Sequence, residues 1–163
     1  MPMNIPNHDA VATMPSPVGR VAIYARENKV VFISMGAKGA RERGKSPVLT
    51  KAVRQLGDYF SGRRKELEFE IEVTGTDFQL AVWDQISQLG FGETATYADI
   101  ASAIGNPNAV RAVGGAVGAN PVPLVIGCHR VLGANGRITG YSGGDGIPTK
   151  EWLLRHEHIE YKD

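Results

Sequence analysis

The chain is poor in cysteine, in long apolar runs and in net charge, and each shortage excludes a class of protein. Its 163 residues include a single cysteine, so an internal disulfide and a zinc site built from several thiolates are both excluded. No run approaches the roughly 20 apolar residues of a membrane span, and residues 1–14 lack a basic flank followed by an apolar stretch. We therefore expect a cytoplasmic protein that makes no contact with a membrane.

The formal net charge is only +1, and its distribution is uneven. Residues 1–76 carry 12 Lys and Arg against 8 Asp and Glu, whereas residues 77–163 carry 6 against 9. A protein that attracts nucleic acid over its whole surface normally has a clear basic excess. Any nucleic-acid site in the second half must therefore depend on local rather than general basic charge.

The remaining composition, 42% hydrophobic and 21% charged, is typical of a globular protein. Two β-branched runs at 18–26 and 29–34, separated by Glu27-Asn28, predict a hairpin. One apolar stripe predicts a helix, and alternation of apolar residues with glutamate over 67–73 predicts a strand with one face in water. The stripe consists of Leu49, Val53, Leu56 and Phe60. Residues 15–74 are thus predicted to form a small α/β unit.

The second half, residues 75–163, has a helical pattern. Thr76 and Gln79 form a capping box that opens one helix, Thr96 caps a second, and a third is predicted over about 108–118. Helices joined by a tight glycine-containing turn are the sequence form of a helix-turn-helix. The apolar run 122–126 then predicts a strand, Asn135-Gly136 predicts a tight hairpin turn, and a last helix is predicted from near Pro148.

Cys128 lies directly after this predicted strand. Free cysteine is usually a small buried apolar residue, and burial raises the pKa of a thiol, so a reactive Cys128 needs a proton acceptor such as His129. Neighbours on a regular strand point to opposite faces, so the two can cooperate only if the backbone leaves strand geometry, which Gly127 permits. The base would also need an orienting carboxylate. The downstream candidates are Asp145, Glu151, Glu157 and Glu160.

The third predicted helix has small residues and one charge, Arg111. A helix that reads base sequence in the major groove normally carries several Arg, Asn or Gln side chains, so this one reads little. Its small residues either let the backbone approach phosphates without sequence preference or form a tight packing face. The close spacing of His156 and His158 does not suit two ligands on one helical face, and we expect no metal.

Several stretches in fixed order resemble the O6-alkylguanine-DNA alkyltransferases. They are NPVPLVIGCHRV at 120–131, GYSGG at 140–144, KEWLLRHE at 150–157 and RAVGGA at 111–116. The resemblance extends from Thr76 through the last helix, and the first half is similar in outline through YFSG at 59–62. It implies an α+β fold, with a ribonuclease-H-like domain at 1–74 followed by a winged-helix-like DNA-binding domain at 75–163.

The resemblance also implies the chemistry. Cys128 would accept the alkyl group irreversibly, His129 would deprotonate it through a water, and Glu157 would orient the imidazole. Asn120 would support the loop that bears the nucleophile. Tyr97 would crowd a phosphate so that the nucleotide rotates, and would donate a proton to the departing guanine. The resemblance implies a monomer and no cofactor.

For DNA, the resemblance implies double-stranded DNA carrying O6-alkylguanine as the partner. Arg111 would enter the base stack in place of the flipped nucleotide. Tyr141 and Ser142 would close the pocket over the base, while backbone groups of Val131 and Cys128 would read its edge. The remaining DNA-contacting residues lie on the second and third predicted helices: Thr96, Ala112, Gly114 and Gly115.

The chain departs from the family pattern in three places. The family usually has proline where this chain has Gly127, which predicts a more flexible loop with one more backbone donor. Residues 145–149 make the pocket-closing loop two residues longer than expected, which affects substrate range. The zinc-binding residues found in the N-terminal part of some relatives have no counterpart here.

Three other functions are compatible with parts of this pattern. An alkyltransferase-like protein would bind the lesion without transfer, but such proteins lack the acceptor cysteine that Cys128 provides. A helix-turn-helix regulator would need more base-reading side chains than the Arg111 helix offers. A cysteine hydrolase would need an oxyanion hole and would turn over repeatedly.

Overall fold

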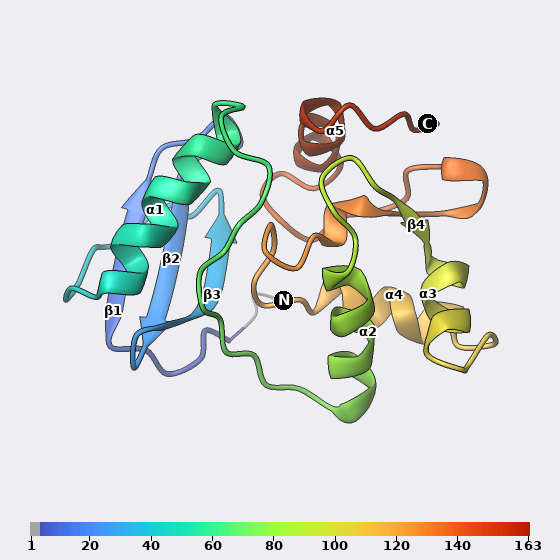
Figure 1. Cartoon of the computed structure of the whole chain (residues 1–163), viewed down its shortest axis with the longest axis horizontal. Helices are drawn as coiled ribbons and strands as arrows, with labels where there is room; N and C mark the ends of the chain where they lie inside the picture. Colours follow the sequence, from blue (N-terminus) through green and yellow to red (C-terminus); the bar gives the residue numbers. More distant parts are fainter. Residues whose placement is uncertain (1–3) are drawn as a thin grey trace. The chain divides into compact units, whose positions relative to one another are not determined.

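The computed structural model describes residues 4–163 and divides into two compact units, one ending at Val73 and the other spanning Thr74–Asp163. The first holds an antiparallel sheet with one long helix, and the second is mainly helical (Figure 1). The predicted α+β class is confirmed. Within the described residues, no helix is both long and apolar enough to cross a membrane.

The first unit is built on a three-stranded sheet in the order β1-β2-β3. The strands are β1 (Ala10–Met14), β2 (Val21–Arg26) and β3 (Lys29–Met35), and helix α1 (Pro47–Phe60) lies against one face of the sheet (Figure 1). Glu27 and Asn28 have φ of 50° and 61°, as a two-residue type I′ hairpin turn requires. The predicted hairpin and the predicted helix are therefore both confirmed.

Two features of this unit differ from the sequence prediction. Strand β1 was not predicted, although it pairs with β2 over its whole length. The strand predicted over 67–73 is wrong, because this segment makes only one bridge, between Val30 and Ile71. Only Phe69 of the segment is fully buried, so too little apolar surface is covered to hold a complete strand against β3.

The second unit begins with three helices: α2 (Asp77–Ser87), α3 (Tyr97–Ala103) and α4 (Val110–Gly118). Both predicted caps are present, since Thr76 and Thr96 each accept a backbone N–H from the third helical residue in a full capping box. The indole nitrogen of buried Trp83 donates to the carbonyl of Ala116 over 2.8 Å, which holds α2 and α4 together. The predicted three-helix arrangement is confirmed.

The rest of this unit is largely irregular. Strands β4 (Ala95–Thr96) and β5 (Val131–Leu132) form a short parallel pair, Asn135 and Gly136 form a left-handed turn with φ of 61° and 76°, and helix α5 (Ile147–His156) follows. The tight turn and the last helix were predicted.

The strand predicted over 122–126 is wrong. Leu124 has φ of 77°, and the segment folds back so that Pro123 bridges Ile126. Pro121 and Pro123 have no backbone N–H to donate to a sheet, so this apolar run forms a buried turn.

Candidate active site

The backbone leaves extended geometry immediately before Cys128. Gly127 has φ −73° and ψ 63°, and the N–H of Cys128 donates to the carbonyl of Ile126 over 2.7 Å, which is an inverse γ-turn. Cys128–Arg130 then form one turn of 3₁₀ helix. The side chains of Cys128 and His129 are both buried, at 3% and 0% exposure. Cys128 and His129 could act together only if the backbone left strand geometry, in which neighbouring side chains point to opposite faces. The turn at Gly127 and the 3₁₀ helix meet this condition.

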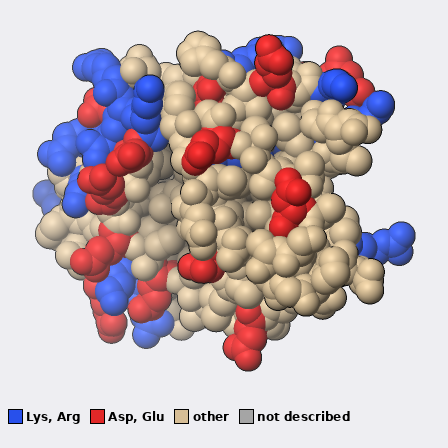
Figure 2. Space-filling model, turned by 45° about the vertical axis from the view of Figure 1, so that its right-hand side comes forward, with Lys and Arg blue, Asp and Glu red and all other residues tan. Residues whose placement is uncertain are grey.

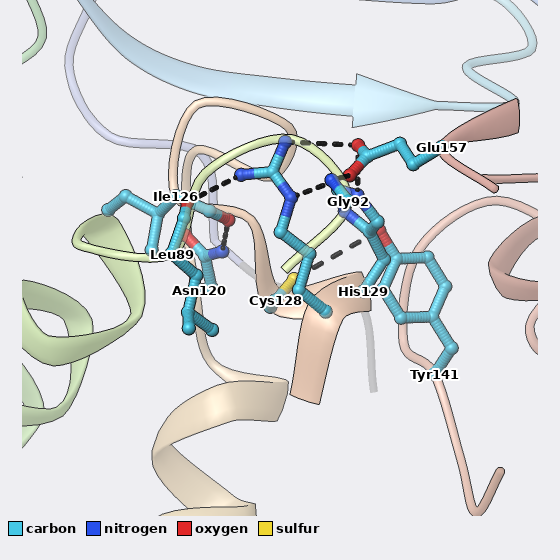
Figure 3. A network of polar contacts seen from close by, with 9 residues as sticks. Leu89, Gly92, Asn120, Ile126, Cys128, His129, Tyr141 and Glu157 are labelled. Atoms are coloured by element: carbon cyan, nitrogen blue, oxygen red, sulfur yellow. Dashed lines mark hydrogen bonds and ion pairs between the residues drawn. The ribbon is translucent and has the colours of Figure 1, made fainter. Parts of the chain in front are cut away.

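Asn120 holds this turn from the end of α4. Its side-chain Nδ2 donates to the carbonyl of Ile126 over 2.8 Å (Figure 3), and its Oδ1 accepts the N–H of Val122 over 2.9 Å. The side chain is buried, and it acts to lower the pKa of the Cys128 thiol. The amide thus fixes both ends of the loop that leads to the thiol.

Burial raises the pKa of the Cys128 thiol. Hydrogen bonds with Asn120 and Tyr141 and the positive charge of Lys150 act in the opposite direction without overcoming burial. The sulfur lies 4.0 Å from the hydroxyl of Tyr141 (Figure 3). At rest Cys128 is therefore a protonated thiol that needs a base to become a nucleophile.

His129 is placed to be that base. Its Nε2 lies 2.7 Å from Oε2 of Glu157 (Figure 3), and burial lowers its pKa despite the opposing effect of the carboxylate, so the imidazole is neutral at pH 7. An ionised carboxylate can only accept, so Nε2 carries the ring proton. Within residues 4–163, Nδ1 of His129 is the one buried side-chain N or O atom without a hydrogen-bond partner. Its lone pair is free to take a proton.

Glu157 lies at the end of α5, and its carboxylate accepts several hydrogen bonds. They include those from Nε2 of His129, from Nε and Nη2 of Arg130 at 2.8 and 3.0 Å, and from the N–H of Gly92 at 3.1 Å. Burial alone would raise the pKa of this carboxyl, but the hydrogen bonds from His129 and Arg130 outweigh it and hold the pKa well below its usual range. Glu157 is therefore ionised whenever the protein is folded at ordinary pH.

Of the four downstream carboxylates, the structure brings Glu157 to the imidazole. Glu151 instead accepts from the hydroxyl of Tyr161 over 2.8 Å, and Asp145 and Glu160 are exposed. The residues alone left this choice open, and it was the family resemblance that selected Glu157.

Two buried cations were not identified from the sequence. Arg130 is 6% exposed, and Lys150 is completely buried with its Nζ donating to the carbonyls of Val131 at 2.7 Å and Gly140 at 3.2 Å. Burial lowers the pKa of Lys150 to about 8. Lys and Arg normally indicate surface in a sequence. The available signal was the spacing of seven residues between Lys150 and Glu157, which places both on one face of the last helix.

A cavity of about 140 Å³ lies between α3, α4 and the loop before α5. Its lining residues include four predicted site residues, and Ser142 Oγ donates to the carbonyl of Gly118 over 3.1 Å. The lining is Tyr97, Gly114, Val117, Gly118, Gly140, Tyr141 and Ser142. The hydroxyl of Thr139 donates to that of Tyr97 over 3.3 Å. A larger cavity of about 680 Å³ lies in the first unit and contains none of these residues.

Predicted DNA-contacting residues on α4 lie at the surface. Arg111, Ala112 and Gly115 are exposed, and a Cβ added at Gly114 or Gly115 would meet nothing within 4 Å. The small residues are thus not required by packing at these two positions, in contrast to buried Ala116. Thr96 serves as the cap of α3, and Val131 is buried in β5.

Charge is sparse on much of the surface. Figure 2 shows Lys and Arg gathered mainly at one side of the visible face, with isolated charges on a broad uncharged area. Within the described residues, no group of three or more His, Cys, Asp or Glu side chains is arranged to hold a metal ion.

Comparison with known proteins identifies the family. The model of the 6-O-methylguanine DNA methyltransferase ribonuclease-like domain matches residues 11–73, and that of the DNA binding domain matches residues 77–159. The constitutive methylated-DNA--protein-cysteine methyltransferase of Bacillus subtilis is 36% identical over 93% of this chain and 96% of its own length. The Methanosarcina acetivorans methylated-DNA--protein-cysteine methyltransferase is 40% identical over 90% of this chain and 96% of its own length.

A solved structure agrees with these sequence matches. The crystal structure of Mycobacterium tuberculosis OGT in complex with DNA is 37% identical, with a TM-score of 0.81, covering 91% of this chain and 92% of that one. The sequence relatives and the structural match cover nearly the whole length on both sides. This chain therefore belongs to the 6-O-methylguanine DNA methyltransferase family, with a ribonuclease-like domain followed by a DNA-binding domain.

Proposed function

We propose that this protein repairs DNA by removing the alkyl group from O6-alkylguanine and keeping it on Cys128. The observation that carries the proposal is the buried His129–Glu157 pair directly beside buried Cys128 in the chain, in which, among the described residues, Nδ1 of His129 has no hydrogen-bond partner. Such an arrangement supplies a nucleophile, a base with an available lone pair, and an anion that orients the base.

The reaction follows from these groups. The thiol proton of Cys128 passes through a water to Nδ1 of His129, and Glu157 stabilises the imidazolium that results. The thiolate attacks the alkyl carbon, so an S–C bond forms while the bond between that carbon and guanine O6 breaks. The electron pair leaves with the guanine, and Tyr97 supplies the proton that neutralises it. Because water does not cleave the thioether product, each molecule acts once.

The base must leave the duplex to reach the sulfur, at a cost of a few kcal/mol that is smaller for a damaged base. We assign the cavity bounded by Tyr97 and Tyr141 to the extruded base, with Tyr141 and Ser142 closing it and backbone groups of Val131 and Cys128 reading its edge. Arg111 fills the space left in the stack. Because the bond from Ser142 to Gly118 closes the loop against α4, this loop opens when the base enters.

DNA is held through the surface of α4. Exposed Arg111 supplies the local positive charge, and the small residues Ala112, Gly114 and Gly115 let the helix backbone approach the phosphates. This mode of contact does not depend on sequence, which suits a protein that must find a lesion in any context. We further propose that the protein acts as a monomer in the cytoplasm.

The test is a stoichiometric repair assay. The protein is incubated with excess duplex containing one O6-methylguanine, and the restored guanine is quantified by nucleoside chromatography. Restored guanine is expected to rise to one equivalent per protein and stop. Continued turnover would indicate a hydrolase instead, and bound duplex with no restored guanine would indicate a lesion-binding protein without transfer. A duplex with ordinary guanine is the control.

Bulk at Gly115 is expected to weaken DNA binding without harming the fold. In Gly115→Glu the new side chain meets no protein atom near its Cβ, and replacing a helical glycine removes a conformational entropy cost. A carboxylate facing phosphates should raise the Kd for duplex DNA about tenfold, and less at high salt. Fluorescence anisotropy measures this. Ala81→Glu, on the exposed face of α2, is the matched control. Equal affinities of the two variants would show that α4 does not face DNA.

A further inference from the structure

Arg130 occupies an unusual position for a charged side chain. It is the last residue of the 3₁₀ turn that begins at Cys128, and it is 6% exposed. Burying a guanidinium costs free energy unless its donors find hydrogen-bond partners of suitable geometry. The partners of Arg130 therefore indicate which role this buried charge has.

The guanidinium binds on two sides. Nε and Nη2 form a two-pronged ion pair with Oε1 and Oε2 of Glu157, at 2.8 and 3.0 Å, and Nη1 donates to the carbonyl of Leu89 over 2.8 Å. A planar fork of this kind fixes both the position and the plane of a carboxylate, which the point charge of an ammonium does not. Arg130 thus holds Glu157 and ties it to the loop that follows α2.

Gly127 provides the space for this arrangement. A Cβ at position 127 would lie 2.7 Å from Nη1 of Arg130 and 3.1 Å from its Cζ, so the guanidinium packs directly over the glycine. The end of a flexible side chain could normally move aside, but three hydrogen bonds hold this one. Gly127 is therefore matched to the position of Arg130.

We propose that Arg130 is a positioning residue for alkyl transfer: it fixes Glu157 as an ionised acceptor, and thereby keeps the proton of His129 on Nε2 and leaves Nδ1 open. Arg130 itself touches neither the thiol nor the substrate in this role. The proposal rests on the proposed function for its rate measurements, but its statement about the His129 proton can be tested without DNA.

Removing the charge of Arg130 changes the balance around the imidazole. The carboxylate of Glu157 favours protonated His129, whereas the nearby charges of Arg130 and Lys150 disfavour it. Without Arg130 the attraction of Glu157 is less opposed, so the pKa of His129 rises. His129 is then protonated, and lost as a base, at a higher pH. The pH below which the transfer rate falls, which is the acid limb of the pH–rate profile, should therefore be higher.

The experiment compares the full-length wild type with Arg130→Met and Arg130→Lys. In Arg130→Met the acid limb of the pH–rate profile is expected to move up by about one pH unit, which makes transfer about tenfold slower on that limb. In Arg130→Lys, where the charge remains but the fork is lost, the limb should stay in place while the plateau rate falls severalfold. A purely structural role would lower all rates without moving the limb.

Nitrogen-15 NMR of the imidazole rings provides the readout without DNA. Wild-type His129 is expected to show a proton on Nε2 and an unprotonated Nδ1, and its pKa should rise in Arg130→Met. If the wild type transfers no alkyl group, the proposed function fails while these spectra still test Arg130. Arg155→Met, a 72% exposed arginine on α5, is the matched control and should change neither measurement.

The proposal fails if Arg130→Met leaves both the acid limb and the pKa of His129 unchanged. Should that variant not fold, as judged by its circular dichroism melting curve, Arg130→Lys decides the matter. Wild-type rates at every pH in Arg130→Lys, or a lower plateau with the His129 proton still wholly on Nε2, would overturn the proposal. A lower plateau together with a His129 proton that is shared between Nε2 and Nδ1 in the nitrogen-15 spectra would support it.

Discussion

Cys128→Ser is expected to lose alkyl transfer entirely while still binding duplex DNA that carries O6-methylguanine. Oxygen replaces sulfur with little change in volume, so the turn at Gly127 and the contacts of Asn120 should persist. A serine hydroxyl is far less acidic than a thiol, and the neutral His129, whose pKa is lowered by burial, is too weak a base to ionise it. The variant should therefore form a stable complex with the lesion.

Two assays together measure this result. Gel-shift titration reports the affinity for the lesion duplex, and nucleoside chromatography reports restored guanine. Wild-type affinity with no restored guanine is the expected combination. If Cys128→Ser restores guanine at the wild-type level, the acceptor is a different residue. Ser102→Ala, an exposed change on α3, controls for handling and should behave as wild type.

Glu157→Ala is expected to be strongly destabilising, by about 3–5 kcal/mol, because it leaves Arg130 buried without its anion. It also removes the partner of His129 Nε2 and of the Gly92 N–H. Urea denaturation followed by circular dichroism gives the free energy of unfolding. Glu151→Ala, a carboxylate on the same helix that accepts from Tyr161, is the matched control and should cost much less. Equal losses for the two variants would contradict a central role for Glu157.

The pH dependence of stability gives an independent check on Glu157. Its pKa in the folded protein lies below the ordinary value of about 4.3, so its contribution to stability is complete above that value. The contribution is lost as the pH falls toward the folded pKa. The difference in unfolding free energy between wild type and Glu157→Gln should therefore shrink below about pH 4. A difference that stays constant there would show that the folded and unfolded pKa values are alike.

The elements predicted well from the sequence are those set by local chemistry. The capping boxes at Thr76 and Thr96 involve residues three apart, and the Glu27-Asn28 turn needs only its two residues and the flanking strands. Short-range hydrogen bonds fix these features whatever the rest of the chain does. The same holds for the left-handed turn at Asn135.

The errors have two causes: an apolar pattern that fits both a strand and a buried turn, and a strand that depends on a distant partner. The run 122–126 has the composition of a strand, yet Asn120, Pro121 and the positive φ of Leu124 make it a turn. Strand β1 forms because it pairs with the edge of β2, and the local sequence of Ala10–Met14 does not indicate this pairing.

The candidate site shows the same division. The sequence indicated that Cys128 needs His129 and a carboxylate, but spacing alone could not choose Glu157 from four candidates. The burial of Arg130 and Lys150 was not predicted, because the sequence does not distinguish a buried Lys or Arg from an exposed one. They are paired with groups distant along the chain, Glu157 and the carbonyls of Val131 and Gly140.

Mapping the transferred methyl group to a residue tests directly whether Cys128 is the acceptor. The wild type is incubated with duplex containing O6-methylguanine, then digested and analysed by mass spectrometry. We expect one added methyl group per molecule, on the peptide containing Cys128 and located on its sulfur. An unmodified Cys128 after prolonged incubation, or a methyl group on any other residue, would contradict it.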